Sequence, residues 1–169
     1  MKRSEIHSGS LRIRKANLDD APGIFALRRE AILAQCRGHY PPRDLEIWTS
    51  GAMSEAFARR VEELFYVVDV DARMAGCGMI DLSTGKIDAV FVRPEYMRRG
   101  VGRAIMDHLE HLALRAGLAK LHLEATLNAA PFYLALGFQP EGDKLYRSSL
   151  GVSLACVSMS KPLRKGWEG

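Results

Sequence analysis

The residues with the clearest chemical potential are six consecutive positions, Arg-Arg-Gly-Val-Gly-Arg at 98–103. Glycines leave the backbone uncovered, so its N–H groups can approach a ligand closely. A helix that begins here adds partial positive charge and unpaired N–H donors. The arginines add full charges, and these features together favour an anion such as a pyrophosphate. The expected contacts are Arg98, Arg99, Gly100, Val101, Gly102 and Arg103.

The spacing of this run differs from two common nucleotide-binding loops. The Gly-Lys-Ser/Thr ending of a Walker loop does not follow, and the spacing after Gly102 does not fit the Rossmann GxGxxG. A glycine turn at the basic start of a solvated helix is the alternative interpretation of these six residues. A strand before the run and a helix after it favour the phosphate site.

Two predicted elements hold this run in place. Residues 87–92 are rich in β-branched and aromatic types and stop before Pro94, which predicts a strand. Behind the run, Gly117 closes a helix of 101–116 whose apolar residues recur every three or four positions. Those apolar residues are Val101, Ile105, Leu109, Leu112 and Ala116.

The rest of the chain predicts an α/β fold with a mixed sheet covered by helices. Strands are expected at 11–14, 64–70, 74–82, 118–125, around Phe138 and at 152–159. Helices are expected at 20–35, at 44–63 with a break near Gly51, and in a short segment that Asn128 caps and Gly137 closes. Short turns between the strands at 64–92 predict antiparallel pairing there.

Composition indicates one globular domain spanning 1–169, with 1–10 and 163–169 as loose ends. The chain has 47% apolar and 26% charged residues, a net charge of +4 and a pI of about 9.1. Apolar runs stay well short of the roughly 18–20 residues of a membrane helix, and the polar N-terminus indicates no signal peptide. Three scattered cysteines predict neither disulfides nor a metal site, and they favour a cytoplasmic location.

Two stretches resemble signatures of the GCN5-related N-acetyltransferase (GNAT) superfamily. Residues 87–104 resemble its acetyl-CoA signature, Gln/Arg-x-x-Gly-x-Gly/Ala, with Met97 where Gln or Arg is usual. A register shifted by two residues, starting at Arg99, matches as well. Residues 124–138 resemble its second signature, an Asn followed by Phe/Leu-Tyr-x-x-x-Gly-Phe. The resemblance implies a mostly antiparallel sheet with a central splay and helices on both faces.

The resemblance also implies how acetyl-CoA, the expected cosubstrate, would bind. Strands ending near Val92 and Thr126 would splay apart, and the pantetheine arm would pair with backbone groups around Phe91 and Val92. Asn128 would lie beside the arm, and Tyr133 would point at the thioester sulfur. A backbone N–H near Val92 could stabilise the oxyanion, and the Tyr133 phenol could protonate the leaving thiolate.

Tyr133 and a general base are the expected catalytic residues. The alternative for Tyr133 is a core aromatic, although its neighbour Phe132 is the more natural core residue. Glu124 is the first candidate for the base that accepts the amine proton, with Asp88 and Asp81 behind it. An ordinary surface or ion-paired carboxylate is the alternative for each acid, and strand alternation could turn Glu124 to the other face.

The acceptor is an amine whose identity the sequence leaves open. The family builds its acceptor pocket from the first two helices and the late strands, which implicates Tyr40 and Trp48 as substrate-binding residues, with His39 beside them. Packing of an irregular helical segment is the alternative. Tyr146 and Arg147, in a loop before the last strand, are similar candidates. A homodimer through an edge at 152–159 is compatible with the fold.

The sequence therefore predicts an enzyme that moves an acetyl group from acetyl-CoA directly onto a primary amine of a small molecule or peptide. A non-catalytic acyl-CoA sensor of the same fold is the alternative, and retention of Tyr133 argues against it. A nucleic-acid-binding domain is disfavoured because aromatic and basic residues are not interleaved on the strands. No nucleic-acid or membrane partner is expected.

Overall fold

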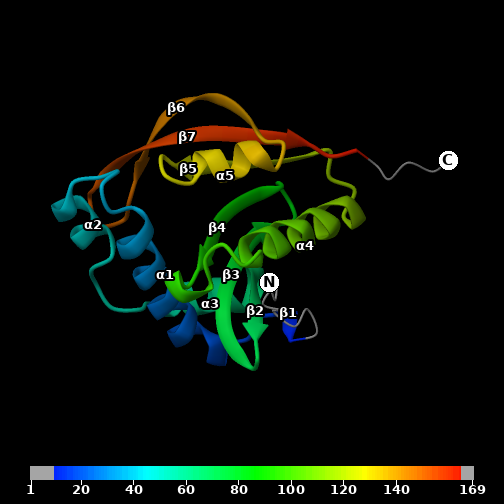
Figure 1. Ribbon diagram of the computed structural model, residues 1–169, viewed down its shortest axis with the longest axis horizontal. Coiled ribbons are helices and arrows are strands. Elements are labelled where there is room, and N and C mark those ends of the chain that lie inside the picture. Colours follow the sequence, from blue (N-terminus) through cyan, green and yellow to red (C-terminus); the bar gives the residue numbers. More distant parts are fainter. Residues whose placement is uncertain (1–9, 165–169) are drawn as a thin grey trace, which may run out of the picture.

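The computed structural model describes residues 10–164, which form a seven-stranded sheet flanked by helices (Figure 1). The strand order is β1-β2-β3-β4-β5-β7-β6, and neighbouring strands are antiparallel except β4 with β5. This confirms the mixed, mostly antiparallel sheet. The strands are β1 Leu11–Lys15, β2 Phe65–Val70, β3 Arg73–Asp81, β4 Lys86–Val92, β5 Lys120–Thr126, β6 Gln139–Arg147 and β7 Ser153–Pro162.

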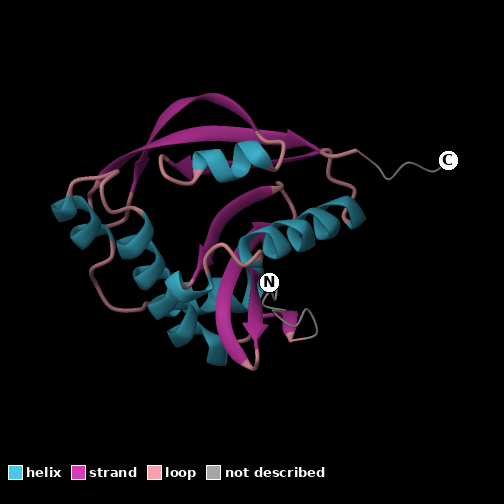
Figure 2. Cartoon of the chain, viewed as in Figure 1, coloured by secondary structure: helices cyan, strands magenta, loops and turns pink. Residues whose placement is uncertain are grey.

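β4 and β5 start side by side and then separate. They pair only at Lys86 with His122 and at Ile87 with Leu123, although each strand has seven residues. Beyond these two pairs, β4 stays paired with β3, and β5 stays paired with β7. The sheet therefore opens into a wedge at its centre, which confirms the expected splay (Figure 2).

Helices lie on both faces of the sheet, as predicted. α1 and α3 pack on one face with alternate side chains of β2 and β3, and α4 and α5 share a second core cluster on the other face. α2 packs with the start of β7. The expected helical region at 44–63 is two helices, interrupted at 49–54. The helices are α1 Ala21–Gln35, α2 Pro42–Trp48, α3 Glu55–Leu64, α4 Val101–Arg115 and α5 Ala130–Ala135, with short 3₁₀ turns at Leu18–Asp20 and Pro94–Tyr96.

Two glycines of β3 let α4 lie directly against the sheet. A Cβ added to Gly78 would lie 2.4 Å from Ile105 Cγ2, and one added to Gly76 would lie 3.0 Å from Val101 Cγ1. Such distances leave no room for a side chain, so close backbone approach requires glycine at both positions. These contacts fix the position of α4 and of the basic loop at its N-terminus.

Two expectations about the region after β5 are wrong. The N-cap of α5 is Ala129 and not Asn128, because the Ala129 N–H closes a turn onto the Thr126 carbonyl and the helix begins one residue later. Tyr146 and Arg147 belong to a strand and not to a loop, because β6 extends through them in antiparallel register with β7.

The segment at 152–159 is not a sheet edge, so the expected dimer contact through it is also wrong. β7 contains most of this segment and is paired on one side with β5 and on the other with β6. Because both of its hydrogen-bonding edges are occupied, no second chain can add to it. The edge strand on this side of the sheet is β6, which is exposed along its length.

The predicted loose ends fall mostly on residues 1–9 and 165–169, which lie outside the described part of the chain. Leu163 lies inside it and differs from the expectation. Its N–H donates to the Ala119 carbonyl at 2.8 Å, and its side chain packs against the α4 cluster. Within residues 10–164, no helix is long and apolar enough to cross a membrane.

Candidate active site

A cavity of about 830 Å³ lies where β4 and β5 separate. β4 contributes Ala89, Val90 and Phe91 to its wall, and β5 contributes Glu124 to Thr126. Further wall residues come from α1, α2, α3 and α5 and from the region that joins β6 to β7. The splay therefore creates a space that residues distant in the sequence can reach together.

The end of β4 directs backbone groups away from β3, next to the cavity-lining Phe91. The Arg93 N–H donates to the Ala75 carbonyl of β3 at 2.8 Å. Because successive residues of a strand direct their N–H groups to opposite sides, the Val92 N–H faces away from β3 and toward the splay. The neighbouring Val92 carbonyl accepts a hydrogen bond from Gln35 Nε2 of α1 at 2.9 Å. The Val92 N–H is thus positioned to donate to a ligand, and Gln35 holds the strand end in place.

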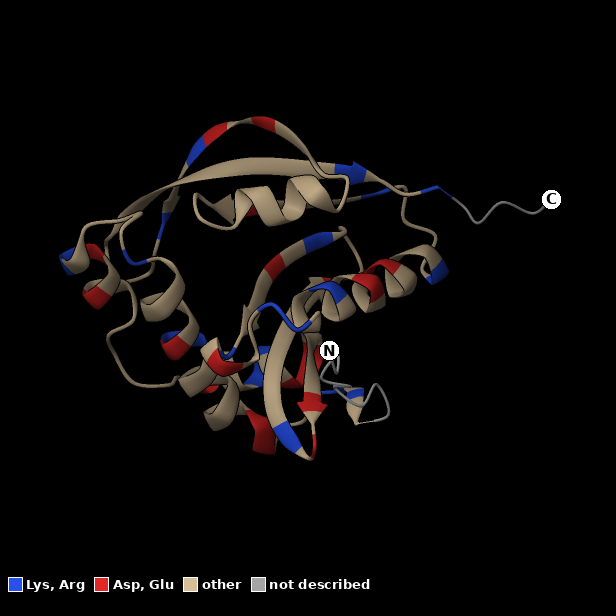
Figure 3. Cartoon of the chain, in the orientation of Figure 1, with Lys and Arg blue, Asp and Glu red and all other residues tan. Residues whose placement is uncertain are grey.

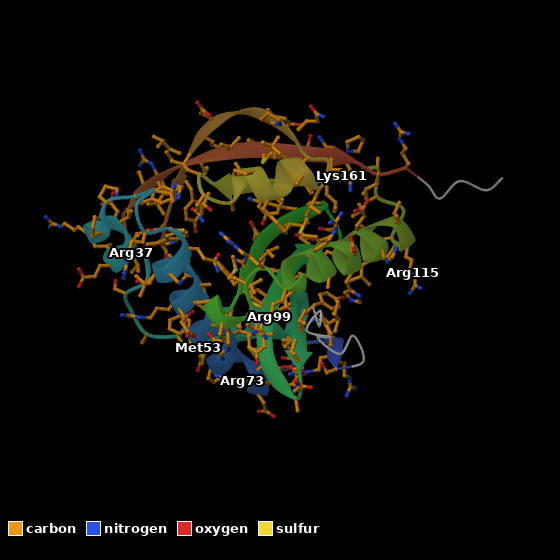
Figure 4. The ribbon with its side chains drawn as sticks, in the orientation of Figure 1. Arg37, Met53, Arg73, Arg99, Arg115 and Lys161 are labelled. Carbon is orange, nitrogen blue, oxygen red and sulfur yellow. The ribbon has the colours of Figure 1, made fainter. Side chains whose placement is uncertain are left out.

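The loop before α4 has the geometry of an anion site. Gly100 is the N-cap of α4 with φ of +79°, and a Cβ there would meet nothing within 4 Å, so its backbone conformation and not crowding favours glycine. Arg98 also has positive φ, at +61°. The first-turn N–H groups at 101–103 have no intrahelical partner, as at any helix start. This loop is basic in Figure 3, and Arg99 is labelled on it in Figure 4.

The arginines of this loop are available to a ligand. Within residues 10–164, Arg98, Arg99 and Arg103 form no ion pair. Arg99 lies over the ring of Tyr96 at 5.7 Å. Gly102 leaves space for Phe132, whose ring carbon would be 3.2 Å from an added Cβ. The loop is therefore joined by direct contact to α5, the helix that carries Tyr133.

Tyr133 is buried in the cavity wall, with 8% of its surface exposed. Its ring packs between Phe132 and Phe138, at centroid distances of 5.1 and 5.6 Å. Burial raises the pKa of Tyr133, and no hydrogen bond in the described part of the chain contributes to it. The phenol is therefore protonated at neutral pH and free to donate. Phe132, which we expected to be the core residue of this pair, is 36% exposed, so that expectation is wrong.

Glu124 reaches the cavity from the face of β5 opposite to Tyr133. Leu121, Leu123 and Ala125 of β5 share the core cluster of Tyr133, and the strand alternates without a bulge. The Glu124 carboxylate accepts a hydrogen bond from Lys144 Nζ of β6 at 2.7 Å. It lines the cavity as an ion-paired carboxylate, as the alternative interpretation held.

The other two acids differ in their positions. Asp88 lines the cavity and is paired with Arg60 at 3.5 Å and Lys86 at 3.4 Å. Asp81 lies outside the cavity wall, and its carboxylate accepts from the N–H and hydroxyl of Ser83 in the turn after β3. These hydrogen bonds lower the pKa of Asp81. The geometry therefore favours Glu124 or Asp88 over Asp81 as a group near the reaction.

Asn128 offers an acceptor that lacks a donor. Its Oδ1 is buried and has no hydrogen-bond partner among residues 10–164. A buried unsatisfied oxygen is costly, and an amide N–H of a ligand lying in the splay would satisfy it. The orphaned Asn128 oxygen, the Val92 N–H and the basic loop are three features that a pantetheine arm with a pyrophosphate would use together.

Tyr40 and Trp48, the two residues expected to bind the substrate amine, differ in their hydrogen bonding. Both line the cavity. The Tyr40 hydroxyl donates to the Ala155 carbonyl at 2.5 Å and accepts from the Leu127 N–H at 3.0 Å, so it links β7 to the end of β5 and has little capacity left. The Trp48 indole N–H is buried and lacks an acceptor in the described residues. His39 is exposed and does not line the cavity.

Sequence reasoning missed the α1 residues of the cavity wall. Phe25, Arg28, Ile32 and Gln35 are spaced three or four apart and form one face of the helix. The signal in the sequence is weak because the apolar residues that bury α1 against the sheet occupy the adjacent face. Only the splay of the sheet shows that this second face lines a cavity and does not face solvent.

With this geometry in place, comparison with known proteins shows the family. The model of the "Acetyltransferase (GNAT) domain" matches residues 36–157. The chain therefore belongs to the GNAT acetyltransferase family. It is 27% identical over 130 residues to the "Uncharacterized N-acetyltransferase YafP" of Escherichia coli (strain K12), an alignment covering 77% of this chain and 82% of that protein.

Solved structures agree with this assignment. A GCN5-related N-acetyltransferase from Rhodopseudomonas palustris ("Aminotransferase, Class-II") superimposes with a TM-score of 0.85 at 27% identity, covering 91% of this chain and 96% of that one. The PaiA N-acetyltransferase from Thermoplasma acidophilum, crystallised with coenzyme A, shares the fold with a TM-score of 0.71 at 19% identity, covering 90% and 99%. The protein is accordingly a GNAT-type N-acetyltransferase.

Proposed function

We propose that this single-domain protein transfers the acetyl group of acetyl-CoA directly onto a primary amine of a small molecule or peptide. The observation that carries the proposal is the cavity at the β4–β5 splay. Its wall includes Asn128, whose side-chain oxygen lacks a donor among residues 10–164, and the buried phenol of Tyr133; the Val92 N–H, which points away from β3, lies one residue beyond the cavity-lining Phe91. In this proposal the basic loop at 98–103 binds the pyrophosphate, and the backbone at Phe91 and Val92 holds the pantetheine arm.

The reaction forms an N–C bond and breaks a C–S bond. Negative charge develops on the carbonyl oxygen of the thioester when the amine attacks. In this proposal the Val92 N–H donates a hydrogen bond to that oxygen and stabilises the charge. The sulfur leaves as a thiolate and needs a proton, which the Tyr133 hydroxyl supplies because a buried phenol is protonated at neutral pH. A neutral amine loses one proton on attack, which Glu124 accepts directly or through water; Glu124 then releases it to solvent, and solvent reprotonates the Tyr133 phenolate to complete the cycle.

The test is a turnover assay on the purified protein. Acetyl-CoA is incubated with a panel of amines, release of free thiol is followed by a colorimetric reagent, and products are identified by mass spectrometry. The proposal predicts thiol release that depends on the amine and a product carrying one added acetyl group. Acetyl-CoA binding without turnover of any amine would contradict it and would favour the acyl-CoA sensor.

A further inference from the structure

Arg28 is a cation in the cavity wall that has no counter-ion within the described part of the chain. It lies on the cavity-lining face of α1, between Phe25 and Gln35. Across residues 10–164 it forms neither a hydrogen bond nor an ion pair. Its guanidinium lies over the Trp48 ring at 5.7 Å, and that ring contacts Tyr146 at 6.1 Å. Arg28, Trp48 and Tyr146 together form what we call the acceptor wall.

The other basic residues of the cavity have carboxylate partners, unlike Arg28. Arg60 and Lys86 also line the cavity, and both are paired with Asp88. The carboxylate of Glu124, the cavity's other acid, is occupied by Lys144. Among the described residues, Arg28 is therefore the one cavity-lining cation without a carboxylate beside it.

The pKa of Arg28 also shifts in the opposite direction to that of Arg14, an arginine with carboxylate partners. Hydrogen bonds to Asp20 and Asp69 raise the pKa of Arg14. Burial lowers the pKa of Arg28, and no carboxylate among the described residues opposes this effect. A partly desolvated guanidinium without a partner costs free energy, and a ligand that brings a carboxylate recovers it.

The donors of the acceptor wall specify the complementary ligand. A guanidinium presents a planar fork of N–H groups that matches a carboxylate in two parallel hydrogen bonds. The Trp48 indole N–H on the same wall also lacks a hydrogen-bond acceptor among residues 10–164. A wall with surplus donors and an aromatic platform selects against a polyamine, whose second ammonium would be repelled by Arg28.

We propose that the acceptor is an amino acid, whose carboxylate binds Arg28 while its amine faces the thioester near Tyr133. This inference rests on the proposed function and narrows its substrate class. Arg28 acts here as a specificity-determining residue. The carboxylate is held on the α1 side of the cavity, and the reacting nitrogen lies on the side of the splay.

The test compares matched acceptors that differ only in the carboxylate. The twenty standard amino acids and their α-carboxamides are assayed with acetyl-CoA, using the wild type, Arg28→Gln, Arg28→Lys and Arg43→Gln. Arg43 is an exposed arginine of α2 outside the cavity wall and is the control for loss of positive charge. Folding of each variant is checked by its melting temperature and by the shift that acetyl-CoA produces.

The wild type is expected to favour at least one amino acid over its amide. Arg28→Gln is expected to lower kcat/KM for that amino acid roughly 10- to 100-fold, mainly through KM, the usual effect of removing one charge-assisted hydrogen-bonding partner. The rate with the amide should fall much less than the rate with the acid, so the ratio of the two rates should drop; Arg28→Lys should lie between, and Arg43→Gln should match the wild type.

Three results would overturn the inference while leaving the proposed function intact. They are equal rates for acids and amides, a preference for the amide, and an Arg28→Gln variant that keeps the acid preference. If turnover is too slow to measure, binding of the amino acids to CoA-saturated protein is measured by calorimetric titration. Absence of binding heat with all of them also overturns the inference. Failure of acetyl-CoA itself to bind would instead refute the proposed function.

Discussion

Substitution of Gly78 by alanine tests whether the contact between β3 and α4 positions the basic loop. The added Cβ would lie 2.4 Å from Ile105 Cγ2 and 3.2 Å from Leu109 Cδ1. Ordinary contacts begin at 3.4 Å, so α4 or the Ile105 side chain must withdraw by 3.4 − 2.4 = 1.0 Å. Overpacking of this kind costs about 1–3 kcal/mol, and each kcal/mol lowers the Tm of a chain this long by roughly 2–4 °C.

The assay is urea unfolding together with acetyl-CoA affinity by calorimetry. Gly78→Ala should be less stable and should bind acetyl-CoA more weakly, because displacement of α4 moves the N–H groups at 101–103. Gly23→Ala is the matched control: its Cβ would meet only the flexible end of Met74 at 3.3 Å, and alanine favours a helix by up to about 1 kcal/mol.

A double variant separates the steric cause from a general loss of stability. Ile105→Ala removes the methyl group that the new Cβ meets, so Gly78→Ala should cost less in the Ile105→Ala background than alone. If Gly78→Ala is as stable as the wild type and binds acetyl-CoA equally well, or if the two substitutions are simply additive, the reasoning from close packing is refuted.

Two further predictions concern the buried groups. Tyr133→Phe should lower kcat by about 10²–10⁴ while leaving the acetyl-CoA-induced rise in melting temperature intact, because only the proton donor is removed; an unchanged kcat in the thiol-release assay would show that another group protonates the thiolate. Burial raises the pKa of Cys77 from 9.0 to about 12, so the folded state holds this proton more tightly. The stability that results is fully present below pH 9 and is lost progressively as the pH rises toward 12. Between pH 8 and pH 10 the wild type should therefore lose about 1 kcal/mol more of its unfolding free energy than Cys77→Ala, and parallel urea-derived profiles would contradict the assignment.

Local patterns predicted most elements of the fold. The apolar repeat of α4 and the strand–turn–strand order at 64–92 correspond to observed elements because both depend on residues close in sequence. The sequence predicts only a strand around Phe138 and not the full length of β6, because its polar sequence, Gln-Pro-Glu-Gly-Asp-Lys-Leu-Tyr-Arg, lacks the alternation of a half-buried strand. It is a strand because β7 pairs with it, which is a tertiary effect.

The site was predictable where its features are local and not where they are tertiary. The glycine–arginine loop precedes a helix in the chain itself, so its location followed from the sequence. Tyr133 is buried and Phe132 is partly exposed, the reverse of the expectation, because this depends on how α5 is rotated against the sheet. The pairing of Glu124 with Lys144, and the lack of a partner for Arg28, join residues from different elements. Such relations require the three-dimensional structure.

The central claim is that the splayed cavity and the basic loop bind acetyl-CoA, and thermal unfolding with saturating acetyl-CoA tests it most directly. Adenosine, which lacks both the pyrophosphate and the pantetheine arm, is the control. At a concentration about 100 times its Kd, acetyl-CoA should stabilise the protein by roughly 2.7 kcal/mol, equivalent to a Tm increase of roughly 5–10 °C. A comparable increase with adenosine, or none with acetyl-CoA, would contradict the account.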